Sequence, residues 1–168
     1  ITSLQNPRIK HIVKLRDDKK QRKQDGLMLV EGFDEIALAI SAGHKPQTLL
    51  SSPELASKQL TFSAAETLTV TRAVFEKMSY RDSPDGWLAI FPIPSTTLDS
   101  VSLLMDASLV IIAESIEKPG NLGAILRTAD AAHVDAVIVC DPRVDLWNPN
   151  VVRASRGTIF TVPIVEVE

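Results

Sequence analysis

The residues best placed to do chemistry lie in segment 114–130, where an apolar run gives way to Lys118-Pro119-Gly120-Asn121. This change predicts the end of a strand and the start of a helix, the usual ligand position in an open α/β sheet. Arg127 falls on the polar face of the predicted helix, and its planar guanidinium suits bidentate phosphate binding. Gly123 lies one turn earlier and is expected to leave room above the guanidinium. The spacing therefore predicts a site that a polyanion can approach.

The same residues have a simpler interpretation, in which Arg127 pairs with Asp130 on a solvated helix face. Helical spacing alone favours that interpretation. A dinucleotide site is not indicated, because Gly120 and Gly123 lack the full G-x-G-x-x-G pattern. The sequence also contains no P-loop, so a nucleotide-binding α/β enzyme lacks its phosphate signature.

The composition narrows the classes of protein further. Hydrophobic content is 45% and charged content 23%, which is ordinary for a globular protein. Cys140 is the single cysteine, so an internal disulfide is excluded, and no His or Cys cluster predicts a metal site. No apolar run approaches the roughly 20 residues of a membrane helix, and a reducing cytoplasm is the expected compartment. No nucleophile triad is indicated either, because the histidines are scattered at His11, His44 and His133.

The charge distribution is uneven. The net charge of −3 argues by itself against a nucleic-acid partner. Residues 1–25, however, carry eight basic and three acidic side chains, a net charge of +5, which leaves −8 for the rest of the chain. This asymmetry predicts that one face meets a polyanion, although composition alone slightly favours a solvated charged helix. The basic residues of the segment are Arg8, Lys10, Lys14, Arg16, Lys19, Lys20, Arg22 and Lys23.

The first half of the sequence alternates between helix and strand patterns. Asn6-Pro7 predicts the start of a helix that runs to about Lys23 and ends near Asp25-Gly26. The next expected elements are a strand at 27–30, a helix at 33–42, strands at 47–51 and 67–71, a helix at 74–78 and a strand at 87–91. This order predicts a layered α/β domain over residues 1–92.

A Pro-containing linker is expected over residues 93–106, followed by a second domain at 107–168. The expected elements are a strand at 108–113 buried on both faces, a helix at 122–132, a strand at 136–140, a helix from Asn148-Pro149 to Gly157, and a strand at 158–165. Such alternation predicts a parallel sheet with right-handed crossovers. The core-facing residues of the first of these helices are expected to be Leu122, Ile125, Leu126 and Ala129.

Several segments together resemble one family. KPGNLGAILRTADAAHVDAVIV resembles the first motif of the SpoU, or TrmH, family of RNA 2′-O-methyltransferases, and NPNVVRASRGTIFTVPI resembles the second. ITSLQNPRIKHIVKL, LMLVEG and VFEKMSYRDSPDGWLAIFP resemble the family's substrate-binding domain. The resemblance covers essentially all 168 residues in the right order. It implies an L30e-like α/β RNA-binding domain at 1–92 and part of a SPOUT domain, an α/β trefoil knot with a parallel sheet, at 107–168.

The resemblance also implies an activity, namely methyl transfer from S-adenosylmethionine to a ribose 2′-hydroxyl, with ribosomal RNA as the expected partner. By this resemblance Arg127 would be the key catalytic residue, engaging a substrate phosphate and helping to activate the hydroxyl. Because arginine stays protonated, a phosphate-coupled role or pure positioning is favoured over that of a free base. Asn121 would orient Arg127 or the ribose, or would be a plain helix N-cap. Arg153 and Ser155 would lie near the RNA or the cofactor, or would belong only to a capped short helix. The remaining residues expected to bind RNA are Arg8, Lys10, Lys14, Lys19, Lys20, Arg22 and Lys23.

Two departures from the family pattern matter. Lys118 stands where family members often have Asp, which is expected to affect substrate choice. The family's third motif, with an Asn-Glu strand end and later Ile-Pro-Met and Ser-Leu-Asn segments, is not found before Glu168. In the family that region closes the knot, lines most of the cofactor pocket and supplies much of the dimer interface.

These 168 residues are therefore expected to lack the knot segment and to be an inactive fragment of an enzyme that is homodimeric at full length. The residues that bind the cofactor are left unassigned. The alternative from another class is a non-enzymatic, L30e-like RNA-binding protein. The spacing of Asn121, Gly123 and Arg127 argues against that alternative.

Overall fold

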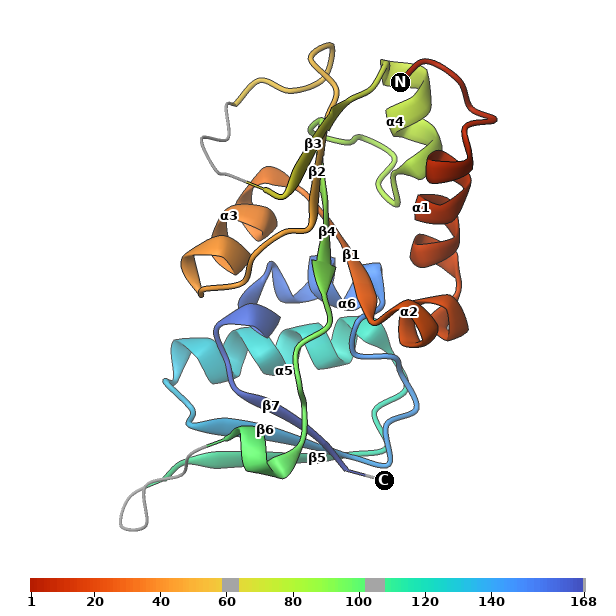
Figure 1. The fold of residues 1–168 in the computed structure, drawn as a ribbon. Coiled ribbons are helices and arrows are strands. Elements are labelled where there is room, and N and C mark those ends of the chain that lie inside the picture. The colour runs from red at the N-terminus through yellow and green to blue at the C-terminus, as the bar shows by residue number, and fades with distance from the viewer. Residues whose placement is uncertain (59–63, 102–107, 168) are drawn as a thin grey trace. The chain divides into compact units, whose positions relative to one another are not determined.

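The computed structural model describes residues 1–58, 64–101 and 108–167. The chain divides into two compact units, Ile1–Ile93 and Pro94–Glu168, which are described separately (Figure 1). Within the described ranges, no helix combines the length and the apolar character that a membrane crossing needs.

The first unit is a four-stranded sheet with helices on both faces (Figure 1). Its sheet order is β1-β4-β2-β3; β4 runs antiparallel to both neighbours, and β2 pairs in parallel with β3. The strands are β1 (Leu27–Glu31), β2 (Thr48–Ser51), β3 (Glu66–Thr69) and β4 (Trp87–Pro92). The helices are α1 (Pro7–Asp17), α2 (Lys19–Asp25), α3 (Phe33–Ser41) and α4 (Arg72–Met78).

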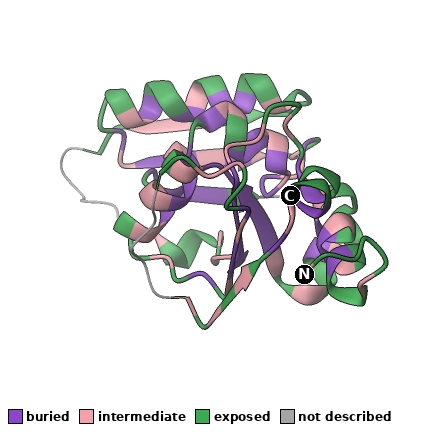
Figure 2. Cartoon of the chain, turned by 90° about the horizontal axis from the view of Figure 1, so that it is seen from above, coloured by how far each residue is buried: buried purple, intermediate pink, exposed green. Residues whose placement is uncertain are grey.

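One face of this sheet forms the main core with α1 and α4. Their apolar side chains pack on Leu29, Leu50, Leu88 and Ile90. Phe75 of α4 is fully buried in this cluster. Figure 2 shows burial concentrated along the strands and on the inward faces of the helices. Helix α3 lies on the opposite face of the sheet, so both faces of the unit are covered (Figure 1).

The single helix predicted from Asn6-Pro7 to about Lys23 is wrong, because the chain forms two helices there. Asn6 does cap α1, with its side chain accepting from the backbone of Arg8. At Asp18 the backbone is extended (φ −115°, ψ 111°), and the Asp18 side chain accepts from Lys20 N at 2.8 Å. An aspartate that caps a new helix competes with continuation of the old one. Gly26 then ends α2 in the left-handed region, at φ 65°.

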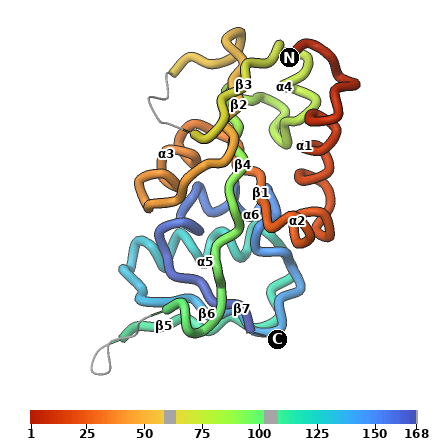
Figure 3. Tube along the Cα trace, viewed as in Figure 1, coloured from red at the N-terminus to blue at the C-terminus, as the bar shows by residue number. Residues whose placement is uncertain are grey.

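The second unit contains a three-stranded parallel sheet of order β5-β6-β7. Figure 3 traces the chain from β5 through α5 to β6. Its elements are η1 (Leu98–Ser100), β5 (Val110–Glu114), α5 (Pro119–Ala131), β6 (Ala136–Cys140), α6 (Pro149–Ser155), η2 (Thr158–Phe160) and β7 (Ile164–Val167). The predicted α/β class and parallel sheet are confirmed. The trefoil knot stays a prediction. The expected linker at 93–106 and the domain start at 107 lie partly outside the described residues.

Two predictions for this unit are wrong. The run 108–113 is not a strand buried on both faces, because β5 is an edge strand and its Ile112 is 70% exposed. The last strand begins at Ile164 and not at Thr158, because residues Thr158–Phe160 form a 3-10 turn after the left-handed Gly157. The sequence 158–163 is apolar enough for a strand, but the turn places the side chains of Ile159, Phe160 and Val162 in the core without strand pairing.

Candidate functional site

Polar residues gather where β5 and β6 end. Because the two strands are parallel and in register, Glu114 pairs with Cys140, and the next residues, Ser115 and Asp141, lie side by side. The Ser115 hydroxyl donates to Asp141 Oδ2 at 3.1 Å. Arg143 donates to the same oxygen at 2.8 Å. Together these side chains form a polar group at the carboxyl edge of the sheet, where ligands bind in such folds.

Sequence reasoning missed this polar group. Ser115 and Asp141 both have positive φ, 51° and 45°, which is uncommon for residues other than glycine. Such backbone conformations cluster at functional sites. The signal that could have found the group is positional, since each residue directly follows a predicted parallel strand.

Helix α5 begins close to that edge, with four residues between it and the end of β5. Its N-cap is Lys118, with Pro119 in the first helical turn. Asn121 is thus the third helical residue, and the alternative that it is the N-cap is wrong. Its backbone N–H donates to Lys118 O at 3.0 Å, and the residue is exposed. The Asn121 amide is therefore accessible to a ligand at the start of the helix.

Asn121 and Arg127 do not share one place on α5. They are six residues apart, roughly 9 Å along the helix axis. Side chains on a helix meet when they are three or four residues apart. Direct orientation of Arg127 by Asn121 is therefore not supported by the geometry.

Arg127 is fixed instead by α6. Its Nη1 donates to the backbone carbonyl of Ala154. The ion pair with Asp130, which spacing alone favours, is not among the described contacts. Asp130 accepts from the Thr161 hydroxyl at 2.6 Å. Arg127 itself is exposed, so the rest of its guanidinium can meet a ligand.

Gly123 serves the packing of α5 on α6. The residue is buried, and a Cβ added to it would lie 2.5 Å from both the carbonyl carbon and the Cβ of Ala154. The expectation that Gly123 leaves room for a polyanion is therefore wrong, because the α6 backbone occupies that space. The predicted core face of α5 also needs a change, since Leu122, Leu126 and Ala129 are buried but Ile125 is only partly so.

Helix α6 carries the second pair of predicted residues. Asn148 caps it as expected, accepting from Asn150 N at 2.8 Å. Arg153 is exposed and donates to Asn150 Oδ1 at 3.0 Å. Ser155 is fully buried, and its hydroxyl donates to Val152 O at 2.8 Å. In this conformation Arg153 can reach a ligand, whereas Ser155 supports the helix from inside.

The predicted basic surface of the first unit is mostly present. Arg22 is the exception: it is 2% exposed, and its Nη1 donates to the carbonyls of Leu15 and Arg16 at 2.6 and 2.9 Å. Arginine near a helix C-terminus commonly satisfies the last carbonyls in this way. Burial thus takes Arg22 out of the exposed basic surface. The exposed members are Arg8, Lys10, Lys14, Lys19, Lys20 and Lys23.

The side chains at the carboxyl edge of the parallel sheet can bind an organic ligand. In those ranges, no group of three or more His, Cys, Asp or Glu side chains is arranged to hold a metal ion. The polar group of Ser115 and Asp141 offers a hydroxyl and a carboxylate, which accept hydrogen bonds from hydroxyl and amino groups.

Comparisons with known proteins agree on both units. The model of the MRM3-like substrate binding domain matches residues 6–89, and that of the SpoU rRNA methylase family matches residues 108–168. The mitochondrial rRNA methyltransferase 3 of Mus musculus is 32% identical over 94% of this chain and 39% of its own. A 23S rRNA uridine 2′-O-methyltransferase of Streptomyces viridochromogenes is 30% identical over 99% of this chain and 60% of its own.

A solved structure has a similar fold. The rRNA methyltransferase of Sinorhizobium meliloti with bound AdoMet is 30% identical and has a TM-score of 0.85. The match covers 99% of this chain and 64% of that protein. The chain thus spans less than two thirds of the length of each of these relatives.

Proposed function

The chain belongs to the SpoU family of rRNA methylases, and on that premise we propose that the protein methylates a ribose 2′-hydroxyl of ribosomal RNA with S-adenosylmethionine as methyl donor. Relatives named as rRNA 2′-O-methyltransferases and an AdoMet-bound structural neighbour support this proposal. A non-enzymatic RNA-binding protein is not favoured, because the methylase model matches residues 108–168.

The Arg127 guanidinium, anchored on the Ala154 carbonyl, is the observation on which the proposal rests. This hydrogen bond joins α5 to α6, the two helices whose sequences carry the family resemblance. A ribose hydroxyl is a weak nucleophile, so the reaction needs the hydroxyl and the methyl donor held in line. Arginine stays protonated and is a poor base. With Nη1 committed to Ala154, the remaining N–H groups of Arg127 would hold a substrate phosphate and so position the ribose.

The carboxyl edge of the parallel sheet would complete the site. S-adenosylmethionine supplies an electrophilic methyl group when it is bound. The Asp141 carboxylate and the Ser115 hydroxyl fit the hydroxyl and amino groups of such a ligand. Asn121, exposed at the start of α5, would bind the substrate ribose.

The first unit would bind the RNA through its exposed cations. Lys10, Lys14, Lys19, Lys20 and Lys23 would contact phosphates without reading sequence. The proposal includes a homodimer as the active form and the cytoplasm as the compartment.

Residues 1–168 alone would bind S-adenosylmethionine weakly and would not methylate RNA. Exposed Ile112 on the edge strand β5 and exposed Leu109 just before that strand support this part of the proposal, because apolar side chains at 70% and 54% exposure favour a covering segment. Calorimetric titration of the 168-residue chain with S-adenosylmethionine tests it. Micromolar binding, about 8 kcal/mol, would contradict it.

Substitution of Arg127 in the full-length protein tests the mechanism. Arg127→Ala should reduce transfer of a radiolabelled methyl group to ribosomal RNA by about 100-fold or more, the range for loss of a positioning contact. Arg127→Lys should recover little, because a lysine cannot bridge the Ala154 carbonyl and a phosphate with one planar fork. S-adenosylmethionine binding should stay unchanged in both variants. Full activity of Arg127→Ala would overturn the proposed role.

A further inference from the structure

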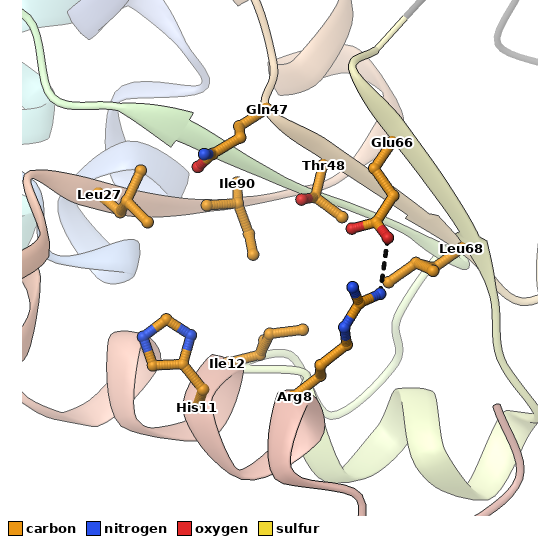
Figure 4. A pocket seen from close by; sticks show the side chains of 9 residues that line it. All are labelled: Arg8, His11, Ile12, Leu27, Gln47, Thr48, Glu66, Leu68 and Ile90. Carbon is orange, nitrogen blue, oxygen red and sulfur yellow. Dashed lines mark hydrogen bonds and ion pairs between the residues drawn. The ribbon is translucent and has the colours of Figure 1, made fainter.

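The first unit contains a pocket of about 270 Å³ between α1 and the face of the sheet that packs toward it. In Figure 4, Arg8, His11 and Ile12 project from α1 on one side, and side chains of all four strands lie on the other. Every residue that lines the pocket belongs to this unit. The pocket therefore shares no residue with the methyl-transfer site described above.

The floor of the pocket is apolar and its rim is polar. Ile12 and Ile90, 2% and 6% exposed, lie at its base. Thr48 pairs with Ile90 on one side and with Glu66 on the other, so these three residues form a row across neighbouring strands. Along this row Ile90 presents an alkyl group, Thr48 a hydroxyl and Glu66 a carboxylate. A ligand in this pocket would meet an apolar surface along its body and hydrogen-bonding groups along one edge.

Two flat side chains stand on the helix side of the pocket. Arg8 and His11 are three residues apart on α1 and share one face. His11 Nε2 lies 2.6 Å from Asp25 Oδ2, and Arg8 Nη1 donates to Glu66 Oε1 at 2.6 Å. These bonds restrain the imidazole and the guanidinium beside the pocket. Their side chains remain 43% and 58% exposed, so a ligand can reach both planes.

This combination matches the way proteins hold an unstacked nucleobase. Bases removed from their stack lie against imidazole or guanidinium planes and form hydrogen bonds through their edges. The Gln47 amide both donates and accepts, and the Glu66 carboxylate accepts from an exocyclic amino group. Arg8 donates, to a base oxygen or to the adjoining phosphate.

We propose that the pocket binds one unstacked nucleobase from a single-stranded stretch of the RNA substrate. The inference rests on the proposed function and adds to it a base-reading site in the first unit. Exposed Lys10 and Lys14, on the same helix, supply phosphate contacts beside it. The Glu66 carboxylate, which already accepts from Arg8, can accept a further hydrogen bond from a ring N–H or an exocyclic amino group of the base.

A pair of RNA probes separates base binding from phosphate binding. One is a short single-stranded RNA of mixed sequence, and the other has the same backbone with every base removed. The natural RNA should shift the methyl resonances of Ile12, Leu68 and Ile90 through ring currents, and the abasic RNA should not. Equal shifts with both probes, or none with either, would overturn the proposal that the pocket binds a base. Guanosine monophosphate that binds as tightly as the RNA would overturn its assignment to RNA.

Variants of uncharged pocket residues supply the second test. Gln47→Ala and Thr48→Met should each weaken binding of the natural RNA by roughly tenfold, within the range for one stacked base. Neither change removes a charge, so the salt dependence of binding should stay the same.

The matched control replaces Lys10 and Lys14 on the outer side of α1 with Ala. This double variant should reduce the salt slope of log K by about 1.4 and leave the methyl shifts in place. If only the lysine variant weakens binding, the pocket is refuted while RNA binding by the first unit stands. If the chain binds no RNA at all, both are refuted.

Discussion

The guanidinium of Arg127 is hydrogen-bonded to the backbone carbonyl of Ala154, so that the one cationic side chain of α5 is positioned by the neighbouring helix. Gly123 lies one turn earlier on α5 and allows the approach, since its missing side chain would fall 2.5 Å from the Ala154 carbonyl carbon. The packing of α5 on α6 and the position of the Arg127 guanidinium thus both depend on Ala154.

Gly123→Ala should destabilise the second unit by about 1–3 kcal/mol, the usual effect of overpacking against backbone. The added methyl group must push α6 away, and the acceptor of Arg127 moves with it. Denaturant unfolding followed by Trp147 fluorescence measures the effect, because Trp147 is buried in this unit. A Trp87→Phe background leaves Trp147 as the sole reporter, as the chain has two tryptophans.

Gly120→Ala is the matched control on the same helix. A Cβ at Gly120 would meet nothing within 4 Å. Alanine restricts the unfolded chain, so the variant should be neutral or more stable by about 0.4–1 kcal/mol. Equal losses in the two variants would contradict the close-packing explanation for Gly123.

Much of the fold could be predicted from sequence because the patterns were local. Asn6-Pro7 and Asn148-Pro149 start helices as expected, and the run 136–140 forms β6 with the predicted bounds. These outcomes depend on capping, on proline and on apolar runs, which act within a few residues. The break at Asp18 is also a local effect, but a continuous helix pattern and a capping aspartate compete there, and periodicity does not decide between them.

The errors at the site arose from contacts between distant segments. That Gly123 faces the α6 backbone depends on residues about 30 positions later in the chain. Arg127 and Asp130 have the spacing of an ion pair, yet their partners are Ala154 and Thr161. Helical spacing shows which residues share a face but not which element covers that face.

Arg22 should matter for stability, unlike its exposed neighbour Lys23. Arg22→Ala would leave the carbonyls of Leu15 and Arg16 without their donor, at a loss of about 1–3 kcal/mol. Lys23→Ala, a surface change, should stay within about 0.5 kcal/mol. Unfolding followed by Trp87 fluorescence in a Trp147→Phe background reports on the first unit. Similar stability of the two variants would show that the buried guanidinium contributes little.

The exposed lysines of α2 should govern RNA affinity through salt. Replacing Lys19, Lys20 and Lys23 with Ala removes three charges and leaves Arg22 in place. The slope of log K against log salt should then fall by about 2 for single-stranded RNA. Fluorescence anisotropy at several salt concentrations measures it. An unchanged slope would remove α2 from the RNA interface.

A buried carboxyl group gives the first unit a distinctive pH dependence. Glu31 is 6% exposed at the end of β1, and burial raises its pKa above the ordinary value of 4.5. Hydrogen bonds from the Ser79 hydroxyl and from Tyr80 N, at 2.7 Å for the latter, lower the pKa only in part. Arg81, which is also bonded to Glu35 at 2.6 Å, acts in the same direction.

The sign of the effect follows from proton linkage. Between pH 4.5 and the raised pKa, the folded state holds a proton on Glu31 that the unfolded state has released. Stability must then fall as the pH rises through this window. The free energy of unfolding of the native chain, relative to that of Glu31→Gln, should therefore be highest near pH 4 and lower at pH 7. Unfolding followed by Trp87 fluorescence across this range measures the difference, and the carboxyl ¹³C resonance of Glu31 should titrate above pH 4.5. A difference that grows with pH, or a resonance that titrates below 4.5, would show that the hydrogen bonds to Glu31 outweigh its burial.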